Sequence, residues 1–185
     1  MTIRLFIIAV TPALALALAV YLNDRYDREP LGLLMKIFLF GALAVIPTVI
    51  VEKLLLGLNV FSGLLAAAYT AFIVAGLTEE DFKREVVRRY AFNDVNFNEK
   101  LDGIVYCVFA AVGFATVENI IYVMFQYSGN YYVGVFRGIF SVPAHFLLGV
   151  TMGYYVSLAK YAQTAIQRED FMRKALYIPA FLHGF

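Results

Sequence analysis

The chain has 185 residues, of which 62% are hydrophobic and 16% charged, and its formal net charge is +1. Soluble domains are seldom more than about half apolar, so the composition predicts that residues 1–185 form a single domain embedded in a bilayer. The only cysteine, Cys107, lies in an apolar run. This excludes an intrachain disulfide and a cysteine-based zinc cluster, and nothing in the sequence is typical of a nucleic-acid-binding surface.

Apolar stretches long enough to cross a bilayer follow one another along the chain. A hydrocarbon core of about 30 Å needs about 20 helical residues. Residues 5–22, 31–51, 59–78, 103–125 and 133–159 have that length, and a sixth stretch, 175–185, reaches only ~16 Å. We therefore expect an all-α, polytopic transmembrane helix bundle with at least six helices. The last helix is truncated, and a C-terminal part of the protein is expected to be missing.

The first stretch has an alternative interpretation. Arg4 followed by an apolar run that contains "ALALALAV" also resembles a signal peptide. The run is long and continues directly into "YLNDRYDREP", so we favour a membrane span.

Basic residues are unequally distributed between the two sets of connections. Three of them, Arg4, Lys53 and Arg137, lie on one side, and the other twelve lie on the opposite side. By the positive-inside rule, the N-terminus is predicted outside a multi-pass protein of the cell membrane, with the long third connection in the cytoplasm. The twelve are Arg25, Arg28, Lys36, Lys83, Arg84, Arg88, Arg89, Lys100, Lys160, Arg168, Arg173 and Lys174.

Proline and turn signals indicate where helices begin. Pro30 suits the first position of the second helix, and Thr78, with Asp81 three residues later, is a candidate cap for a helix over 78–90. The polar segment 93–103 is the clearest loop. Three further prolines, Pro12, Pro47 and Pro143, lie within spans, where neighbouring groups can satisfy the freed carbonyls.

Ionisable side chains inside a membrane cost from about 2.5 kcal/mol upward and usually mark function. Lys36 and Arg137 lie near span ends and can extend to the interface. Glu52 and Lys53 lie at a boundary and can pair weakly. We interpret these four residues as having no functional role.

The pair Glu79–Glu80 is harder to explain in this way. Lys83 follows Glu79 by four residues, on the same helix face, where it can hold a carboxylate charged. Successive helical residues are about 100° apart, so one carboxylate can point into the bundle while the other points toward a different neighbour or the interface. By itself this pattern is most often a solvated helix face.

Three further ionisable residues, Glu118, His145 and His183, lie within or at the end of apolar stretches. Phe114 precedes Glu118 by four residues, and Gly149 follows His145 by four, which allows another helix or a substrate backbone to approach. A lone histidine on an apolar helix is more often a packing residue, and a lone buried glutamate is often structural. Their combination on separate spans favours a site.

Convergence of Glu80, Glu118, His145 and His183 could activate water in two ways. Neutral imidazoles and a carboxylate can hold Zn²⁺ while another glutamate acts as general base. Alternatively, a glutamate and a histidine can polarise water without a metal. The spacing poses a geometric problem, because Glu118 lies ~22 Å along a helix that enters at Gly103. The site can form only if the fourth helix begins below the interface or the third helix continues past residue 78.

The sequence resembles the PrsW family of bacterial intramembrane proteases, which are distantly similar to CAAX prenyl proteases. The matching segments include "DRYDREP", "EEDFK", "DGIVYCVFAAVGFATVENIIYV", "RGIFSVPAHFLLGVTMGYY" and the final "FLHGF". The resemblance implies that Glu79 and Glu80 fill an EExxK motif, Glu118 an FxxxE motif and His145 an HxxxG motif. His183 fills the final histidine motif. In CAAX-type proteases a polar residue follows that histidine by four, which here would be position 187.

The resemblance also implies hydrolysis of membrane-associated protein substrates, such as a membrane-anchored anti-sigma factor, in the bacterial inner membrane. The family is usually described as metalloproteases, so Zn²⁺ is a possible cofactor. We expect Glu80 to act as general base, with Glu79 orienting it and Lys83 assisting. Glu118, His145 and His183 are expected to bind the metal, or to position the water if none is bound. Asn119 is a candidate hydrogen-bond donor to the substrate, with bridging between helices as its alternative.

Two other classes of function remain open on the residues alone. Glutamate and histidine chains within a membrane also serve proton-coupled transporters. A catalytically silent binding or immunity protein could keep the same fold. The EExxK pattern at a span end and the extent of the resemblance favour a peptidase. Neither the cleaved bond nor the oligomeric state is indicated by the sequence.

Overall fold

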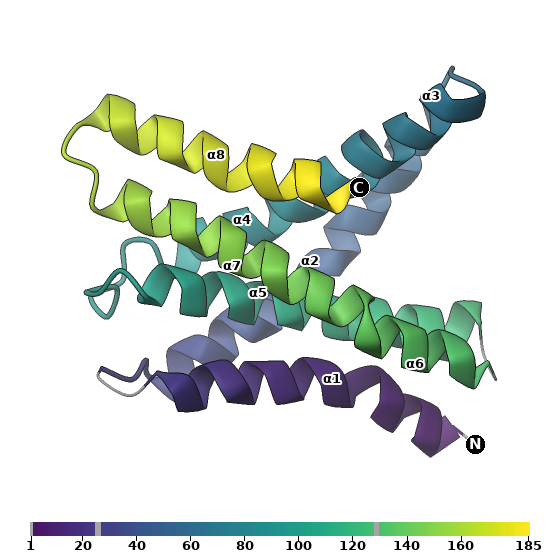
Figure 1. The fold of residues 1–185 in the computed structure, drawn as a ribbon, viewed down its shortest axis with the longest axis horizontal. Coiled ribbons are helices and arrows are strands. Elements are labelled where there is room, and N and C mark those ends of the chain that lie inside the picture. Colours follow the sequence, from purple (N-terminus) through teal and green to yellow (C-terminus); the bar gives the residue numbers. More distant parts are fainter. Residues whose placement is uncertain (1, 25–26, 128–129) are drawn as a thin grey trace.

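The computed structural model describes residues 2–24, 27–127 and 130–185, and within them it contains helices joined by short connections and no strand. This confirms the predicted all-α class (Figure 1). The α-helices are α1 (Thr2–Asn23), α2 (Leu31–Gly57), α3 (Gly63–Ala68), α4 (Thr78–Tyr90), α5 (Asp102–Ile120), α6 (Tyr131–Ile139), α7 (Ser141–Lys160) and α8 (Ala165–His183). Two π-helices, η1 (Tyr69–Leu77) and η2 (Ile121–Gln126), follow α3 and α5 directly.

Four helical segments are long and apolar enough to cross a membrane: Ile3–Asn23, Leu31–Gly57, Asp102–Gln126 and Tyr131–Lys160. They agree with four of the five full-length spans expected from the sequence. The remaining one, 59–78, corresponds to α3 and η1, which continue without a break into α4. The sixth stretch, expected over 175–185, belongs to a helix that begins earlier, at Ala165. The first half of α8 is charged and exposed, so it is not visible as an apolar stretch.

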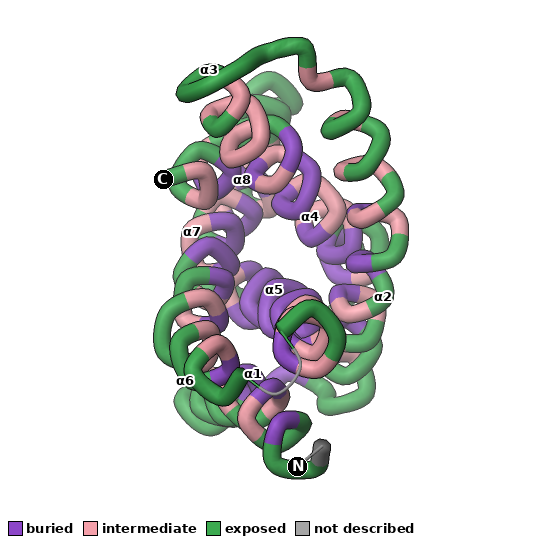
Figure 2. The backbone as a smooth tube through the Cα atoms, turned by 90° about the vertical axis from the view of Figure 1, so that its right-hand side faces the viewer, coloured by how far each residue is buried: buried purple, intermediate pink, exposed green. Residues whose placement is uncertain are grey.

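Helix α5 lies at the centre of the bundle and packs against α7, α2, α1 and α4 (Figure 2). Glycines permit the closest of these approaches. A Cβ atom on Gly149 of α7 would lie 3.0–3.1 Å from atoms of Ala111, Cys107 and Val108 on α5. The small residue of the HxxxG pattern therefore admits another helix, which is the first of the two possibilities we considered.

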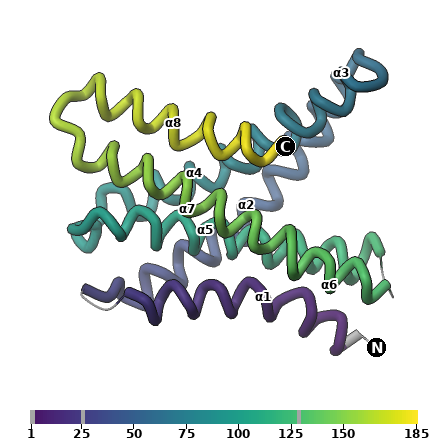
Figure 3. Tube along the Cα trace, in the orientation of Figure 1, coloured from purple at the N-terminus to yellow at the C-terminus, as the bar shows by residue number. Residues whose placement is uncertain are grey.

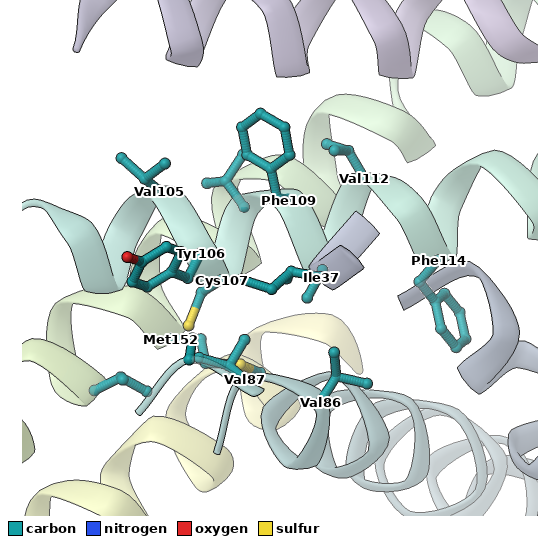
Figure 4. Close-up of a cluster of buried hydrophobic side chains, with 14 of the residues drawn as sticks. Ile37, Val86, Val87, Val105, Tyr106, Cys107, Phe109, Val112, Phe114 and Met152 are labelled. Atoms are coloured by element: carbon teal, nitrogen blue, oxygen red, sulfur yellow. The ribbon is translucent and has the colours of Figure 1, made fainter. Parts of the chain in front are cut away.

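The core around α5 is apolar and includes the only cysteine. Figure 4 shows Tyr106 and Cys107 of α5 close to Met152 of α7 and Val87 of α4, and all four side chains are buried. By contrast, large apolar side chains such as Ile46 and Leu64 are exposed on the outside of the bundle, as expected for surfaces that face lipid. Cys107 is a free thiol, consistent with the absence of a disulfide.

The N-terminal stretch is an integral part of this packing. The α1 residues Ala9 and Ala13 are fully buried, and α1 contacts α5, α6 and α7 (Figure 3). This arrangement agrees with a membrane span in the bundle.

Local signals were less accurate than the spans. Pro30 is the residue before α2 rather than its first residue. The cap expected at Thr78 is wrong, because Thr78 lies inside a continuous helix and its hydroxyl donates to the Ile73 carbonyl at 3.2 Å. The loop expected over 93–103 is confirmed up to residue 101, since α5 begins at Asp102. Arg25, one of the basic residues used for orientation, lies outside the described residues.

Candidate active site

The two adjacent glutamates lie in the first turn of α4, immediately after η1. The Lys83 ammonium donates to Glu80 Oε1 at 2.7 Å and to Glu79 Oε2 at 3.2 Å. Both carboxylates thus converge on one group, and neither turns to a different neighbour or to the interface. Lys83 is both the i+3 and the i+4 neighbour of the pair, and these long side chains bridge the angle between them. Lys83 is fully buried, and its Nζ lies 4.4 Å from the centre of the Phe114 ring.

The continuous helix formed by α3, η1 and α4 explains how Glu80 lies deep enough to approach the level of Glu118. After Glu80 the helix continues for ten residues to Tyr90, or about 15 Å, before the chain turns toward α5. Glu80 therefore lies inside the bundle rather than at its edge. The helix that contains the expected third span begins at Gly63 and continues past residue 78 to Tyr90, which is the second of the two conditions given above for the site to form.

The two histidines complete the cluster from α7 and α8. His145 Nδ1 lies 2.9 Å from Lys83 Nζ, and His183 Nδ1 lies 3.0 Å from Glu80 Oε1. The rings of His145 and His183 are 5.5 Å apart and nearly perpendicular. Because an ammonium can only donate, His145 Nδ1 accepts and its Nε2–H faces Glu118 Oε2, at 2.9 Å.

Four of these residues can offer donor atoms to a metal ion. Glu79, Glu80, His145 and His183 each have a carboxylate oxygen or ring nitrogen, and these atoms all lie within 4.8 Å of one another. Carboxylates with imidazoles are a donor set that suits zinc. Glu80 Oε2 is buried and has no hydrogen-bond partner among the described residues, as expected of an atom that faces a cation or a water. The residues therefore fit a metal.

Glu118, expected among the ligands, lies just outside this group of four. Its Oε2 accepts from His145 Nε2 and from Arg137 Nη2, the latter at 2.8 Å. A carboxylate that accepts from the far nitrogen of a ligand histidine fixes the ring's orientation and tautomer. The position of Glu118 thus suits an orienting role.

Arg137 was interpreted as a residue that extends to the interface, and this is wrong. It points inward, forms the ion pair with Glu118, donates to Asn119 Oδ1 at 2.9 Å and lies over the Tyr122 ring. No helical periodicity could reveal a partner 19 residues away across a turn. The only signal was that Arg137 opens the segment "RGIFSVPAH" that ends in His145.

Asn119 bridges helices, which is the alternative to a contact with the substrate. Its amide nitrogen donates to the Ala9 carbonyl of α1 at 2.8 Å, and its oxygen accepts from Arg137. The side chain is fully buried. Asn119 therefore joins α1, α5 and α6 behind Glu118, and its amide is directed away from the metal-type cluster.

Two cavities reach the cluster. The α7–α8 cavity, of about 520 Å³, is bordered by Glu118, His145 and His183 and by apolar side chains such as Leu148 and Leu182. The α2–η1 cavity, of about 470 Å³, lies between α2, η1 and α5 with η2, and it reaches Glu79 and Glu118. Glu118 borders both.

A buried cluster of carboxylates and imidazoles within a bundle of membrane-length helices is the donor set of a membrane-embedded metal site, and it suits the activation of water. The family model of the PrsW family intramembrane metalloproteases matches residues 29–185. The chain belongs to this family, and it is an intramembrane protease.

Curated relatives support the same assignment. Protease PrsW of Clostridioides difficile (strain 630) is 41% identical over 100% of this chain and 78% of its own length. Protease PrsW of Geobacillus kaustophilus (strain HTA426) is 36% identical over 95% of this chain and 74% of its own length. Protease PrsW of Bacillus subtilis (strain 168) is 31% identical over 95% and 77%, respectively. No solved structure matches the chain.

Proposed function

We propose that Glu79, Glu80, His145 and His183 form the hydrolytic centre of this protease. The proposal rests on one observation. Three helices that are far apart in sequence, α4, α7 and α8, bring donor atoms of these four side chains within 4.8 Å of one another. Burying so many ionisable groups in a membrane bundle is costly, and a structural role would need fewer of them.

In this proposal Glu80 is the general base. Its Oε1 is held by Lys83 and His183, and the unpartnered Oε2 accepts a proton from the attacking water. The same carboxyl group then returns the proton to the leaving amine. Glu79 shares the Lys83 ammonium with Glu80 and keeps the charge of the pair balanced.

Glu79, His145 and His183 would hold the metal, for which we propose Zn²⁺, and Glu80 is left free to act as the base. When bound, it would polarise the scissile carbonyl and make the water more acidic. Glu118 would keep the His145 Nε2–H engaged, so that the Nδ1 lone pair faces the centre. The metal content of the purified full-length protein distinguishes this mechanism from a metal-free one.

We further propose that the substrate is a membrane-anchored protein of the anti-sigma-factor type, with the N-terminus of the protease outside and the 91–101 connection in the cytoplasm. The α7–α8 cavity supports this substrate class, because apolar side chains such as Leu148 and Leu182 lie in its lining beside Glu118 and the two histidines and suit a segment that arrives from lipid.

The test uses the full-length enzyme in proteoliposomes and measures cleavage of a membrane-anchored substrate. Glu80→Gln should lower kcat by about 10²–10⁴-fold, because the amide cannot take up the proton. Glu85→Gln is the matched control on the same helix, since Glu85 only pairs with Arg88 and Arg89 at the surface. Cleavage by Glu80→Gln at the rate of the control would disprove the assignment.

A further inference from the structure

The α2–η1 cavity carries several polar groups on a mainly apolar lining, and one of them, Glu52, has no part in the proposed chemistry. Three carboxylates, Glu52, Glu79 and Glu118, border it together with Lys53 and with the hydroxyl and amide side chains of Thr70 and Gln126. Apolar packing between membrane helices does not need carboxylates, and such residues usually face a water-filled space. Its volume of about 470 Å³ is enough for on the order of ten waters at about 30 Å³ each.

Glu52 is the clearest indication that this cavity holds water. No described residue donates a hydrogen bond to its carboxylate or forms an ion pair with it, so the pairing with Lys53 that we considered is not formed. The side chain is half-buried, and it faces the cavity from a membrane helix. A carboxylate without a protein partner is expensive in an apolar environment unless water solvates it.

The cavity extends from the ends of helices to the cluster. At one limit its lining includes Leu56, next to the last residue of α2, and Gln126, the last residue of η2. At the other limit it includes Glu79, which accepts a hydrogen bond from Lys83, and Phe114, whose ring lies against the Lys83 ammonium. On α2 the lining spans residues 45 to 56, or about 16 Å of helix.

We propose that the α2–η1 cavity is a water passage that supplies the hydrolytic water to the site from the side where α2 ends, with Glu52 holding water midway. The α7–α8 cavity, bordered by the two histidines, is then left to the substrate. This inference rests on the proposed function, because only a hydrolytic site consumes water. It separates the routes of the two reactants, with Glu118 between them.

The test measures aqueous access by cysteine labelling and does not depend on catalysis. Cys107 is the only native cysteine and is buried, so Cys107→Ala gives a background without thiols. In this background, Glu52→Cys and Thr70→Cys are each compared with a lipid-facing control on the same helix, Ile50→Cys and Ile73→Cys respectively. The full-length variants, in open membrane fragments, are treated with a charged, membrane-impermeant thiosulfonate.

We expect the two cavity cysteines to react at least about tenfold faster than their controls, because thiolates and charged reagents are excluded from lipid. Labelling of Thr70→Cys should also lower kcat several-fold, whereas treatment of Ile73→Cys should leave it unchanged. Equal labelling rates at cavity and control positions would overturn the passage. That result would leave the proposed hydrolytic centre standing, and active Glu80→Gln enzyme would instead refute the centre without affecting the labelling.

Discussion

Replacing Arg137 by glutamine removes the one arginine or lysine among the described residues that forms an ion pair with Glu118. The two side chains are 2.8 Å apart and only 13% and 18% exposed. Removing one partner of a fully buried ion pair costs about 3–5 kcal/mol, and partial exposure reduces this to about 1–3 kcal/mol. Since Glu118 orients His145, we also expect activity and metal affinity to fall by about 10–100-fold, as is typical of partners behind a ligand histidine.

The assay measures kcat/KM and metal content of the folded, full-length protein alongside its thermal unfolding. Arg173→Gln is the matched control, because Arg173 pairs with Glu169 on the exposed face of α8. Arg137→Lys should recover part of the activity, since lysine keeps the charge but cannot hold Glu118 and Asn119 together. A purely structural role would lower only the melting temperature. Wild-type kcat/KM and metal content in Arg137→Gln would refute the reasoning.

Two further predictions concern charge and proton binding. Lys83→Met should destabilise the protein by about 3–5 kcal/mol, because Glu79 and Glu80 lose the cation that they share. The surface variant Lys174→Met is the control and should have the melting temperature of the wild type. Equal melting temperatures of the two variants would contradict this prediction. Burial beside the Tyr106 hydroxyl, in the connection before α2, raises the pKa of Glu29 from 4.5 to about 7. The contribution of Glu29 to stability is therefore complete below pH 4.5 and is lost as the pH rises to about 7, by at most about 1.4 kcal/mol per pH unit. The melting temperature of Glu29→Gln should depend less on pH between pH 5 and 8 than that of the wild type. An unchanged pH dependence would contradict this prediction.

Four of the spans and the residues of the candidate cluster stand out in the sequence for one physical reason. A bilayer requires long apolar helices, so their positions are visible in the composition, and ionisable residues within them are conspicuous because they are costly. Glu118 and His145 were found in this way. What each residue does was less predictable, since the difference between a metal ligand and a residue that orients a ligand depends on which nitrogen of His145 faces Glu118.

Contacts between distant segments left no periodic signal. Arg137 and Glu118 lie on different helices, and the same is true of Asn119 and Ala9, so neither contact follows from spacing along one helix. Position near a span end led us to assign Arg137 to the interface, although its charge is turned into the bundle. An arginine near the end of a span can extend to the membrane interface or turn into the bundle toward a carboxylate, and the sequence does not distinguish these two positions.

The two π-helices adjoin the acidic residues and interrupt the 3.6-residue period there. η1 ends at Leu77, just before Glu79, and η2 begins at Ile121, just after Glu118. A π-helix bonds residue i to i+5 and is therefore wider than an α-helix, so the side chains that follow it point in directions that the 3.6-residue period does not predict. The Thr78 hydroxyl bonds the carbonyl five residues back and follows this wider turn. Both acidic motifs thus adjoin a change of helical register, and the wide turns contribute Thr70, Tyr122 and Gln126 to the cavity that reaches Glu79 and Glu118. The departure from α-helical geometry therefore lies beside both acidic motifs and contributes side chains to the cavity that they border.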